Sequence, residues 1–322
     1  MMRISGFTGL LLLLVSQCVH AQSTKENLWL FSLENASGHT KITQATKLTD
    51  TAGYSNQPHF SVDGSKLYYT QALTTDEGQQ TDVFVYDIVR GFHTNLSRSA
   101  TSEYSPTPRF DGSGLSVILV DSDGKQWLWG LAFDGTKQAR LFQAQPVGYH
   151  VWINEKAVLA FVLGDAQNNE PHTLQRLSLN GSAVIIDQDI GASLWAIPGK
   201  GIFSYTKNPA PESQPSTLMG WDPDGNSGSV LTLLPDNVDY MAWTPRGEAI
   251  IVKGNAIWRW KPEEIYDSEV STTNENEVED SMLANTVNGW EKWLDIGTYC
   301  PKGGSRLHMS QNGTYLAVVC QE

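Results

Sequence analysis

The chain has 322 residues and a formal net charge of −13, from 22 Lys and Arg against 35 Asp and Glu. This acidity argues against nucleic acid as a partner, and the solubility of an exported protein is enough to explain it. Beyond the first 21 residues, no stretch approaches the roughly 20 uncharged apolar residues of a membrane-spanning helix, so we expect no membrane span in the mature chain.

Residues 1–21 have the pattern of a secretory signal peptide: Arg3 gives a positive start, a leucine-rich run follows, and Ala21 gives a small-residue exit. Without this segment the chain carries 21 Lys and Arg against 35 Asp and Glu, a net charge of −14. We therefore predict a periplasmic or secreted protein, cleaved near Ala21. The alternative, a lipid anchor on Cys18, is disfavoured because Gln17 occupies a position that requires a small residue.

The stretch from Pro58 to Tyr69 predicts a β-hairpin that recurs along the chain. Phe60 is followed by a turn that ends in Gly64 and by a strand entered at Leu67. The same seven-residue pairing joins Phe110 to Val117, Trp152 to Leu159, Trp195 to Ile202, Trp243 to Ile250 and Met309 to Leu316. The glycine, expected because a tight turn needs positive φ, recurs as Gly114, Gly199, Gly247 and Gly313.

Two further strands are predicted beside these hairpins. The third strands are residues 27–33, 82–88, 126–133, 172–179, 217–222 and 256–260. The fourth strands include residues 44–49, 94–96, 140–142, 183–186 and 229–234. Units of four antiparallel strands, mostly 40 to 50 residues apart, are typical of the blades of a β-propeller.

The sixth unit has its hairpin at residues 308–319, but the chain ends at Glu322 without a third and a fourth strand. Two strands without a hairpin stand at the other end of the chain, at residues 28–33 and about 44–49. We therefore predict an all-β, six-bladed propeller over residues 22–322, whose last blade combines strands from both termini. This closure leaves no exposed sheet edge between the first and last strands.

The segment Pro58-His-Phe-Ser-Val-Asp-Gly64 resembles the repeat of TolB-like, WD-repeat-like bacterial propellers, and residues 108–110 and 243–247 resemble it less closely. The resemblance covers nearly the whole mature chain and implies the fold, whereas propellers host many unrelated activities. TolB carries an α/β domain before its propeller. Only a few residues separate Ala21 from the first strand here, so we expect the propeller alone.

Residues 263–289 interrupt the fifth unit with eight acidic residues and no Lys or Arg. Their composition predicts a flexible, solvated surface loop, with an acidic arm that binds a partner as the alternative. Cys300 and Cys320 are the two cysteines after the signal peptide. In an oxidising compartment we predict that they form a disulfide, which would seal the ring and contribute about 3 kcal/mol.

The connections between blades, and those between second and third strands, should emerge together on one face of the ring. They include the longer and more varied loops at residues 72–81, 164–171 and 207–216, and we expect ligand or partner binding there, over the central channel.

The position before each repeat aromatic provides three candidate binding residues, His59, Arg109 and His308. His59 and His308 belong to adjacent blades. A metal requires three or four ligands, and the matching positions in the third to fifth blades are apolar. We therefore predict neither a metal nor another cofactor.

No Gly-x-Ser-x-Gly, His-Glu-x-x-His, Cys-x-x-Cys or phosphate-binding glycine loop is present. We therefore favour a monomeric binding or scaffolding protein of the cell envelope, which recognises a protein or a small ligand, over an enzyme. Two alternatives remain open. One is a metal-assisted lyase or lactonase-like hydrolase that uses His59 and His308. The other is a carbohydrate-binding module, suggested by eleven tryptophans, although most stand at repeated strand positions and should pack between blades.

Overall fold

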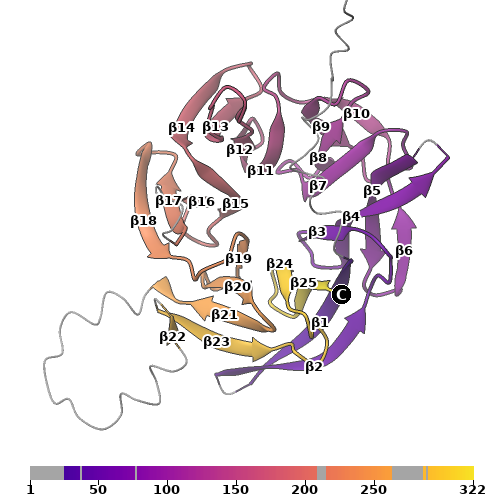
Figure 1. The fold of residues 1–322 in the computed structure, drawn as a ribbon, viewed down its shortest axis with the longest axis vertical. Coiled ribbons are helices and arrows are strands. Elements are labelled where there is room, and N and C mark those ends of the chain that lie inside the picture. Colours follow the sequence, from indigo (N-terminus) through magenta and orange to yellow (C-terminus); the bar gives the residue numbers. More distant parts are fainter. Residues whose placement is uncertain (1–24, 37, 77, 209–214, 263–285, 288) are drawn as a thin grey trace, which may run out of the picture.

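The computed structural model describes residues 25–36, 38–76, 78–208, 215–262, 286–287 and 289–322. They form 25 strands in six sheets arranged around a central axis (Figure 1). Five sheets have four antiparallel strands, and the fifth blade has a short additional strand at its outer edge. The predicted six-bladed propeller is confirmed. Within the described residues, no helix is long and apolar enough to cross a membrane.

The blades are numbered in chain order, with their strands given from the axis outward. Blade 1 contains β3 (Ser55–Phe60), β4 (Lys66–Thr75), β5 (Gly78–Asp87) and β6 (Phe92–Asn95). Blade 2 contains β7 (Ser102–Pro108), β8 (Leu115–Val120), β9 (Gln126–Leu131) and β10 (Lys137–Arg140). Blade 3 contains β11 (Val147–Asn154), β12 (Ala157–Val162), β13 (Thr173–Ser178) and β14 (Ala183–Gln188).

The remaining blades follow the same plan. Blade 4 contains β15 (Ile190–Ala196), β16 (Phe203–Lys207), β17 (Thr217–Asp222) and β18 (Ser227–Leu233). Blade 5 contains β19 (Met241–Trp243), β20 (Ala249–Lys253), β21 (Ala256–Trp260), β23 (Trp290–Asp295) and β22 (Thr286–Val287). Blade 6 contains β24 (Gly304–Met309), β25 (Tyr315–Gln321), β1 (Glu26–Ala36) and β2 (His39–Lys47).

Blade 6 closes the ring, as predicted. β1 from the start of the propeller pairs antiparallel with β25, so that Glu26 lies opposite Gln321 and Ser32 opposite Tyr315. The carboxylate of Glu322 forms ion pairs with Lys25 at 3.2 Å and Lys47 at 2.7 Å. The two ends of the propeller are thus held together by main-chain pairing and by charge.

The predicted disulfide between Cys300 and Cys320 is present. Cys300 lies in the turn that follows β23 of blade 5, and Cys320 lies in β25 of blade 6, with Cα atoms 5.2 Å apart. Both residues are fully buried. The bridge therefore joins the closing blade to its neighbour.

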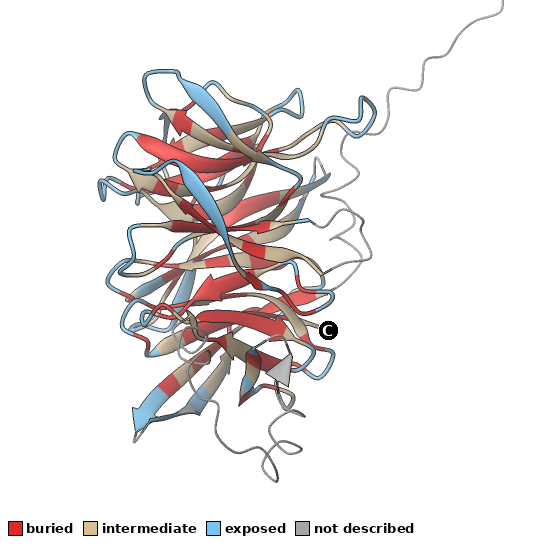
Figure 2. Cartoon of the chain, turned by 90° about the vertical axis from the view of Figure 1, so that its left-hand side faces the viewer, coloured by how far each residue is buried: buried red, intermediate tan, exposed pale blue. Residues whose placement is uncertain are grey.

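The hydrophobic core is divided into six clusters, and each lies between two neighbouring blades. Between blades 6 and 1, for example, Ala317 packs with Phe60 and Leu67. Figure 2 shows that buried residues concentrate in the inner strands and exposed residues in the outer strands and turns. Because apolar packing occurs between blades, the axis of the ring is left available for polar side chains.

The eleven tryptophans follow this arrangement, with five buried and six half-buried. The five predicted turn glycines all have positive φ, between 70° and 155°. The seven-residue pairing is confirmed only for Phe60 with Leu67 and for Met309 with Leu316. In blades 2 to 5 the facing pairs are Pro108 with Leu115, Trp152 with Val158, Trp195 with Ser204 and Trp243 with Ala249. The prediction was wrong there because the registers of these hairpins differ: the residue that faces Trp152 or Trp243 stands six positions later, and the residue that faces Trp195 stands nine positions later. Phe110, which is 61% exposed, lies in the turn itself.

Residues 72–81 were expected to be a loop. Residues 72–75 and 78–81 instead extend the β4–β5 hairpin, in which Ala72 pairs with Thr81 and Thr75 with Gly78. The predicted signal peptide, residues 209–214 of the predicted loop at 207–216, and residues 263–285 and 288 of the acidic insertion lie outside the described residues.

Candidate functional site

A cavity of about 530 Å³ lies at the centre of the ring, on the face where we expected the ligand. Its wall includes residues from the beginning of the inner strands, Thr81 of the third strand β5, and His172 from the connection between β12 and β13. The side chains that reach toward the axis come from all six blades: Gln57, Tyr104, Tyr149, Ala192, Tyr240 and Arg306.

β-Bulges in the inner strands shape this wall. In five of the six inner strands the register with the second strand shifts, and the shift falls at the cavity: between Asn56 and His59 in β3 and between Gly304 and Leu307 in β24, for instance. A bulge inserts an unpaired residue and redirects the side chains next to it. Arg306 lies in the bulge of β24, and this is how a strand residue reaches the axis.

The bulge at Gln57 is held in place by hydrogen bonds of the Gln57 side chain. The φ of Gln57 is 57° and lies in the left-handed region, which a non-glycine residue adopts only at a cost of about 1–3 kcal/mol. Its side-chain Oε1 accepts hydrogen bonds from Thr70 Oγ1 and from the backbone N–H of Ser105, both at 2.8 Å. The second bond links blade 1 to blade 2, so the bulge is fixed by the neighbouring blade.

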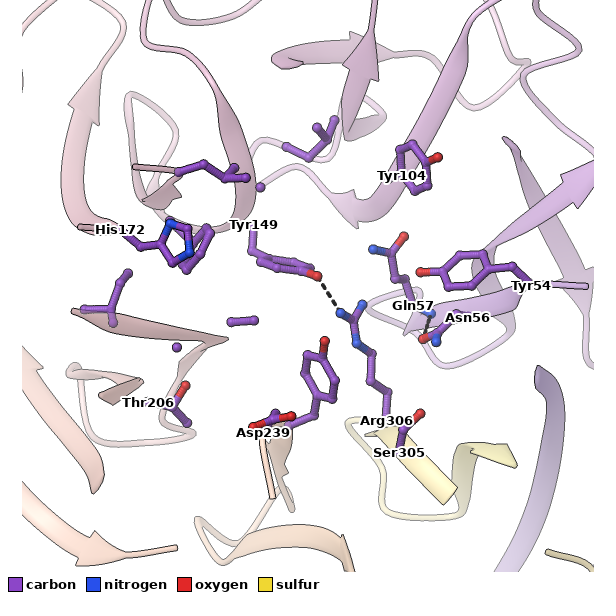
Figure 3. A pocket seen from close by; sticks show the side chains of 18 of the residues that line it. Tyr54, Asn56, Gln57, Tyr104, Tyr149, His172, Thr206, Asp239, Ser305 and Arg306 are labelled. Carbon is purple, nitrogen blue, oxygen red and sulfur yellow. Dashed lines mark hydrogen bonds between the residues drawn. The ribbon is translucent and has the colours of Figure 1, made fainter. Parts of the chain in front are cut away.

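Arg306 occupies the middle of the cavity (Figure 3). Its Nη2 donates a hydrogen bond to the Tyr149 hydroxyl at 2.5 Å, and the ring of Tyr240 lies 3.9 Å from the guanidinium carbon. Its Nε is buried without a hydrogen-bond partner, and none of the described residues forms an ion pair with it. A guanidinium remains charged at any physiological pH, so this cavity holds a permanent positive charge surrounded by phenol rings.

The carboxylate of Glu26 lies on the blade 6 side of the cavity and is buried. It accepts a hydrogen bond from Asn56 Nδ2 at 2.8 Å, and burial raises its pKa, against the opposing effects of that bond and of Arg306. Burial also raises the pKa of Tyr54 well above 10, so its hydroxyl is a neutral donor and acceptor. Asp239 is the second acidic side chain in the lining and is exposed.

A smaller pocket of about 100 Å³ lies farther along the channel, toward the hairpin turns. His59 and Trp195 line this pocket, and both contact His308: the ring centroids of His59 and His308 are 4.3 Å apart, and Trp195 stacks on His308 at 4.8 Å. His308 Nδ1 accepts the backbone N–H of Phe60 at 2.9 Å. We name this aromatic group, with His150, the histidine pocket.

The imidazoles of the histidine pocket are held neutral. Burial lowers the pKa of His59 to about 4, despite its hydrogen bond to the Phe60 carbonyl. Burial, helped by the proximity of His59, lowers the pKa of His150 to about 3 and that of His308 well below its usual value. At neutral pH the three imidazoles therefore carry no charge, and Arg306, which borders the smaller pocket as well as the central cavity, is the cation next to them.

The three candidate binding residues do not come together. His59 and His308 are in contact, as their adjacent blades suggested. Arg109 lies elsewhere: it bonds to Asp111 at 2.9 Å and to Gln138 of the outer strand β10 at 3.1 Å. Within the described part of the chain, no group of three His, Cys, Asp or Glu side chains is arranged to hold a metal.

Sequence reasoning missed Arg306, Tyr149 and Tyr240. The spacing along the strand could have indicated Arg306, which stands two residues before the candidate His308. Alternation along a strand places residues two apart on the same face. Tyr149 and Tyr240 stand three residues before Trp152 and Trp243, as Arg306 does before Met309. This position lies two residues before the one that we considered.

No protein-family model matches the chain, and no curated protein is similar to it in sequence. Solved structures with a similar fold include TolB from Acinetobacter baumannii, with a TM-score of 0.53 and 11% identity, over 92% of this chain and 64% of that one. A proposed TolB from Agrobacterium tumefaciens gives a TM-score of 0.62 and 11% identity, over 93% and 99%. A proposed gluconolactonase gives 0.57 and 10%, over 91% and 98%.

At such low identities the similarity shows the fold alone. The chain spans less than two thirds of the Acinetobacter TolB chain. TolB-like propellers are thus the structural neighbours of this chain, as the repeat suggested, and the comparisons determine no activity.

Proposed function

We propose that the protein is an exported binding protein of the cell envelope, which recognises a ligand or a segment of a partner protein in the central cavity. One observation carries this proposal. The cavity contains a permanent charge, Arg306, whose partners are tyrosines rather than a carboxylate. Unpaired charges are costly to bury, so natural proteins keep them where a ligand or solvent completes their interactions.

Two features of the chain support export. The disulfide between Cys300 and Cys320 is of a kind that persists in oxidising compartments. Residues 1–21 have the composition of a signal peptide. The mass of the protein recovered from a bacterial periplasm should correspond to a chain that begins at Gln22, and recovery of the uncleaved chain from the cytoplasm would contradict export.

A cavity-filling variant tests the binding role. Ala192 lines the cavity, so Ala192→Phe should occupy part of its volume. Ala139 is exposed on the outer strand β10, and Ala139→Phe is the matched control. We expect that compounds from a metabolite panel which raise the melting temperature of the wild type will also do so for Ala139→Phe but not for Ala192→Phe. If no compound distinguishes the two variants, the cavity is not a binding site.

A second candidate function is a metal-assisted lyase or lactonase-like hydrolase. The contact between His59 and His308 favours this candidate, and a proposed gluconolactonase is among the structures with a similar fold. Replacing both histidines with Gln should then reduce lactone turnover and the metal content of the purified protein. A metal-free wild type, with lactone turnover that the double substitution leaves unchanged, would remove this candidate.

A further inference from the structure

We propose that the group recognised by Arg306 is a carboxylate, carried by a compact molecule with a flat ring. This inference rests on the proposed function, since it names the ligand class of the same cavity. It follows from the free bonding capacity of the guanidinium, from the charges around it, and from the aromatic wall.

The guanidinium of Arg306 has N–H groups that remain available to a ligand. A guanidinium has five N–H donors. In Arg306 one at Nη2 is donated to Tyr149 at 2.5 Å, a further side-chain hydrogen bond involves Tyr240, and Nε has no hydrogen-bond partner among the described residues. The ring of Tyr240 covers the guanidinium at 3.9 Å, and the ring of Tyr149 lies 4.9 Å from it. These rings satisfy the faces of the cation but accept few of its hydrogen bonds. A ligand would therefore bind in the plane of the guanidinium, where its N–H groups point outward. A carboxylate can accept two of these N–H groups at once, in a bidentate pair.

The charges around the cavity favour one negative charge over two. Among the described residues that line the cavity, Arg306 is the single Lys or Arg, whereas Glu26 and Asp239 are both acidic. A carboxylate would be matched by the guanidinium. A phosphate dianion would add a second charge close to Glu26, with no second cation to balance it.

Glu26 does not already neutralise the arginine. Its Oε2 accepts a hydrogen bond from Asn56 at 2.8 Å, and burial raises its pKa against the opposing effects of that bond and of Arg306. Glu26 interacts with Arg306 through space but makes no ion pair with it. The site for a carboxylate at the guanidinium is therefore open.

The walls favour a flat ring on the ligand. Tyr54, Tyr104, Tyr149, Phe161 and Tyr240 line the cavity from five different strands or strand ends. Aromatic surfaces of this kind stack on ring-bearing ligands and bury their apolar area. The volume of about 530 Å³ falls within the range of pockets for small organic molecules.

Three probes with the same phenyl body test this inference by isothermal titration calorimetry. Benzoate carries a single negative charge, phenyl phosphate carries up to two, and benzamide is neutral. We expect benzoate to bind the wild type more tightly than either of the others. Arg306→Gln should weaken benzoate binding about 30-fold or more, because it removes the only cation from a desolvated pair. Arg306→Lys should weaken it less, since it keeps the charge but loses the planar fork.

Arg140 provides a matched control. It is exposed on β10 and stacks on Trp127 at 4.4 Å, which resembles the contact of Arg306 with Tyr240. Arg140→Gln should leave benzoate affinity unchanged. If Arg306→Gln fails to fold, the comparison of Arg306→Lys with the wild type still measures the contribution of the fork.

Two results with the wild type would overturn the inference directly: no detectable benzoate binding up to about 10 mM benzoate, or an equal affinity for benzamide. Tighter binding of phenyl phosphate than of benzoate would also overturn it. So would an unchanged benzoate affinity in both Arg306 variants. None of them would remove the binding role of the cavity, which depends on the separate comparison of Ala192→Phe with Ala139→Phe.

Discussion

The two ends of the channel are built from the same inner strands, yet one contains a charged guanidinium and the other contains imidazoles that are held neutral. Arg306 and His308 stand two residues apart on β24. The first is a permanent cation that lines the cavity of about 530 Å³ and also borders the adjoining pocket of about 100 Å³. The second is a neutral imidazole in contact with His59, which lines that smaller pocket. The difference follows from the chemistry of the two side chains rather than from the strand that carries them.

A buried imidazole can release its proton, and the histidine pocket is stable because its imidazoles do so: the pKa of His59 falls to about 4. A guanidinium has no such option. Arg306 therefore requires tyrosine rings, an open cavity and, in our proposal, an anionic ligand. One end of the channel is thus suited to tight aromatic packing, and the other is suited to recognition.

The largest effect should come from placing a permanent charge in the histidine pocket. His308→Arg would bury a cation that cannot lose its proton, and we expect it to lower the free energy of unfolding by about 3–5 kcal/mol. Urea denaturation measures the change. His39 is exposed on β2, so His39→Arg should stay within about 0.5 kcal/mol of the wild type. A loss below about 1 kcal/mol for His308→Arg would mean that the pocket tolerates charge, and the contrast between the two ends would fail.

A smaller effect is expected from pH. The unfolded chain protonates its histidines near pH 6.5, whereas His59 resists protonation until about pH 4. The unfolded state therefore binds more protons in this window, and the stability from the neutral imidazole is lost as the pH falls from 6.5 toward 4. At pH 5, His59 alone should account for about 2 kcal/mol.

Urea denaturation of the wild type and of His59→Gln at pH 7, 6 and 5 measures this effect. The wild type should lose stability more steeply than His59→Gln, while His39→Gln should follow the wild type. Glu26 and Asp82 have pKa values raised by burial, so they act in the opposite direction and cannot produce the loss. Parallel curves for the wild type and His59→Gln would show that solvent reaches the imidazole.

The smallest effect concerns the support of Arg306. Tyr149→Phe removes the hydroxyl that accepts from Nη2, and the guanidinium should then be less well oriented. We expect benzoate binding to weaken about threefold to tenfold, in line with one hydrogen bond of about 1 kcal/mol, with an unchanged dependence of stability on pH. Tyr69→Phe removes a comparable bond, to His93 at 2.9 Å outside the channel, and should change neither property. An altered pH dependence in Tyr149→Phe would show that the two ends are coupled.

The sequence by itself determined the architecture of this protein. Apolar segments recur at a regular spacing, glycines such as Gly64 and Gly313 mark the turns, and two unpaired strands at the start complete the hairpin at the end. These are local signals, because strand alternation and turn geometry depend on neighbouring residues. The pairing of Cys300 with Cys320 followed from the same closure.

The tertiary structure alone decided that side chains from different blades come into contact at the axis. Arg306, Tyr149 and Tyr240 are far apart in the chain, and bulges in the inner strands help to turn such residues into the cavity. A bulge depends on how a strand fits its partner and the next blade, as the bond from Ser105 to Gln57 shows. Contacts across the ring leave little trace in local sequence, since they arise only when six blades close around one axis.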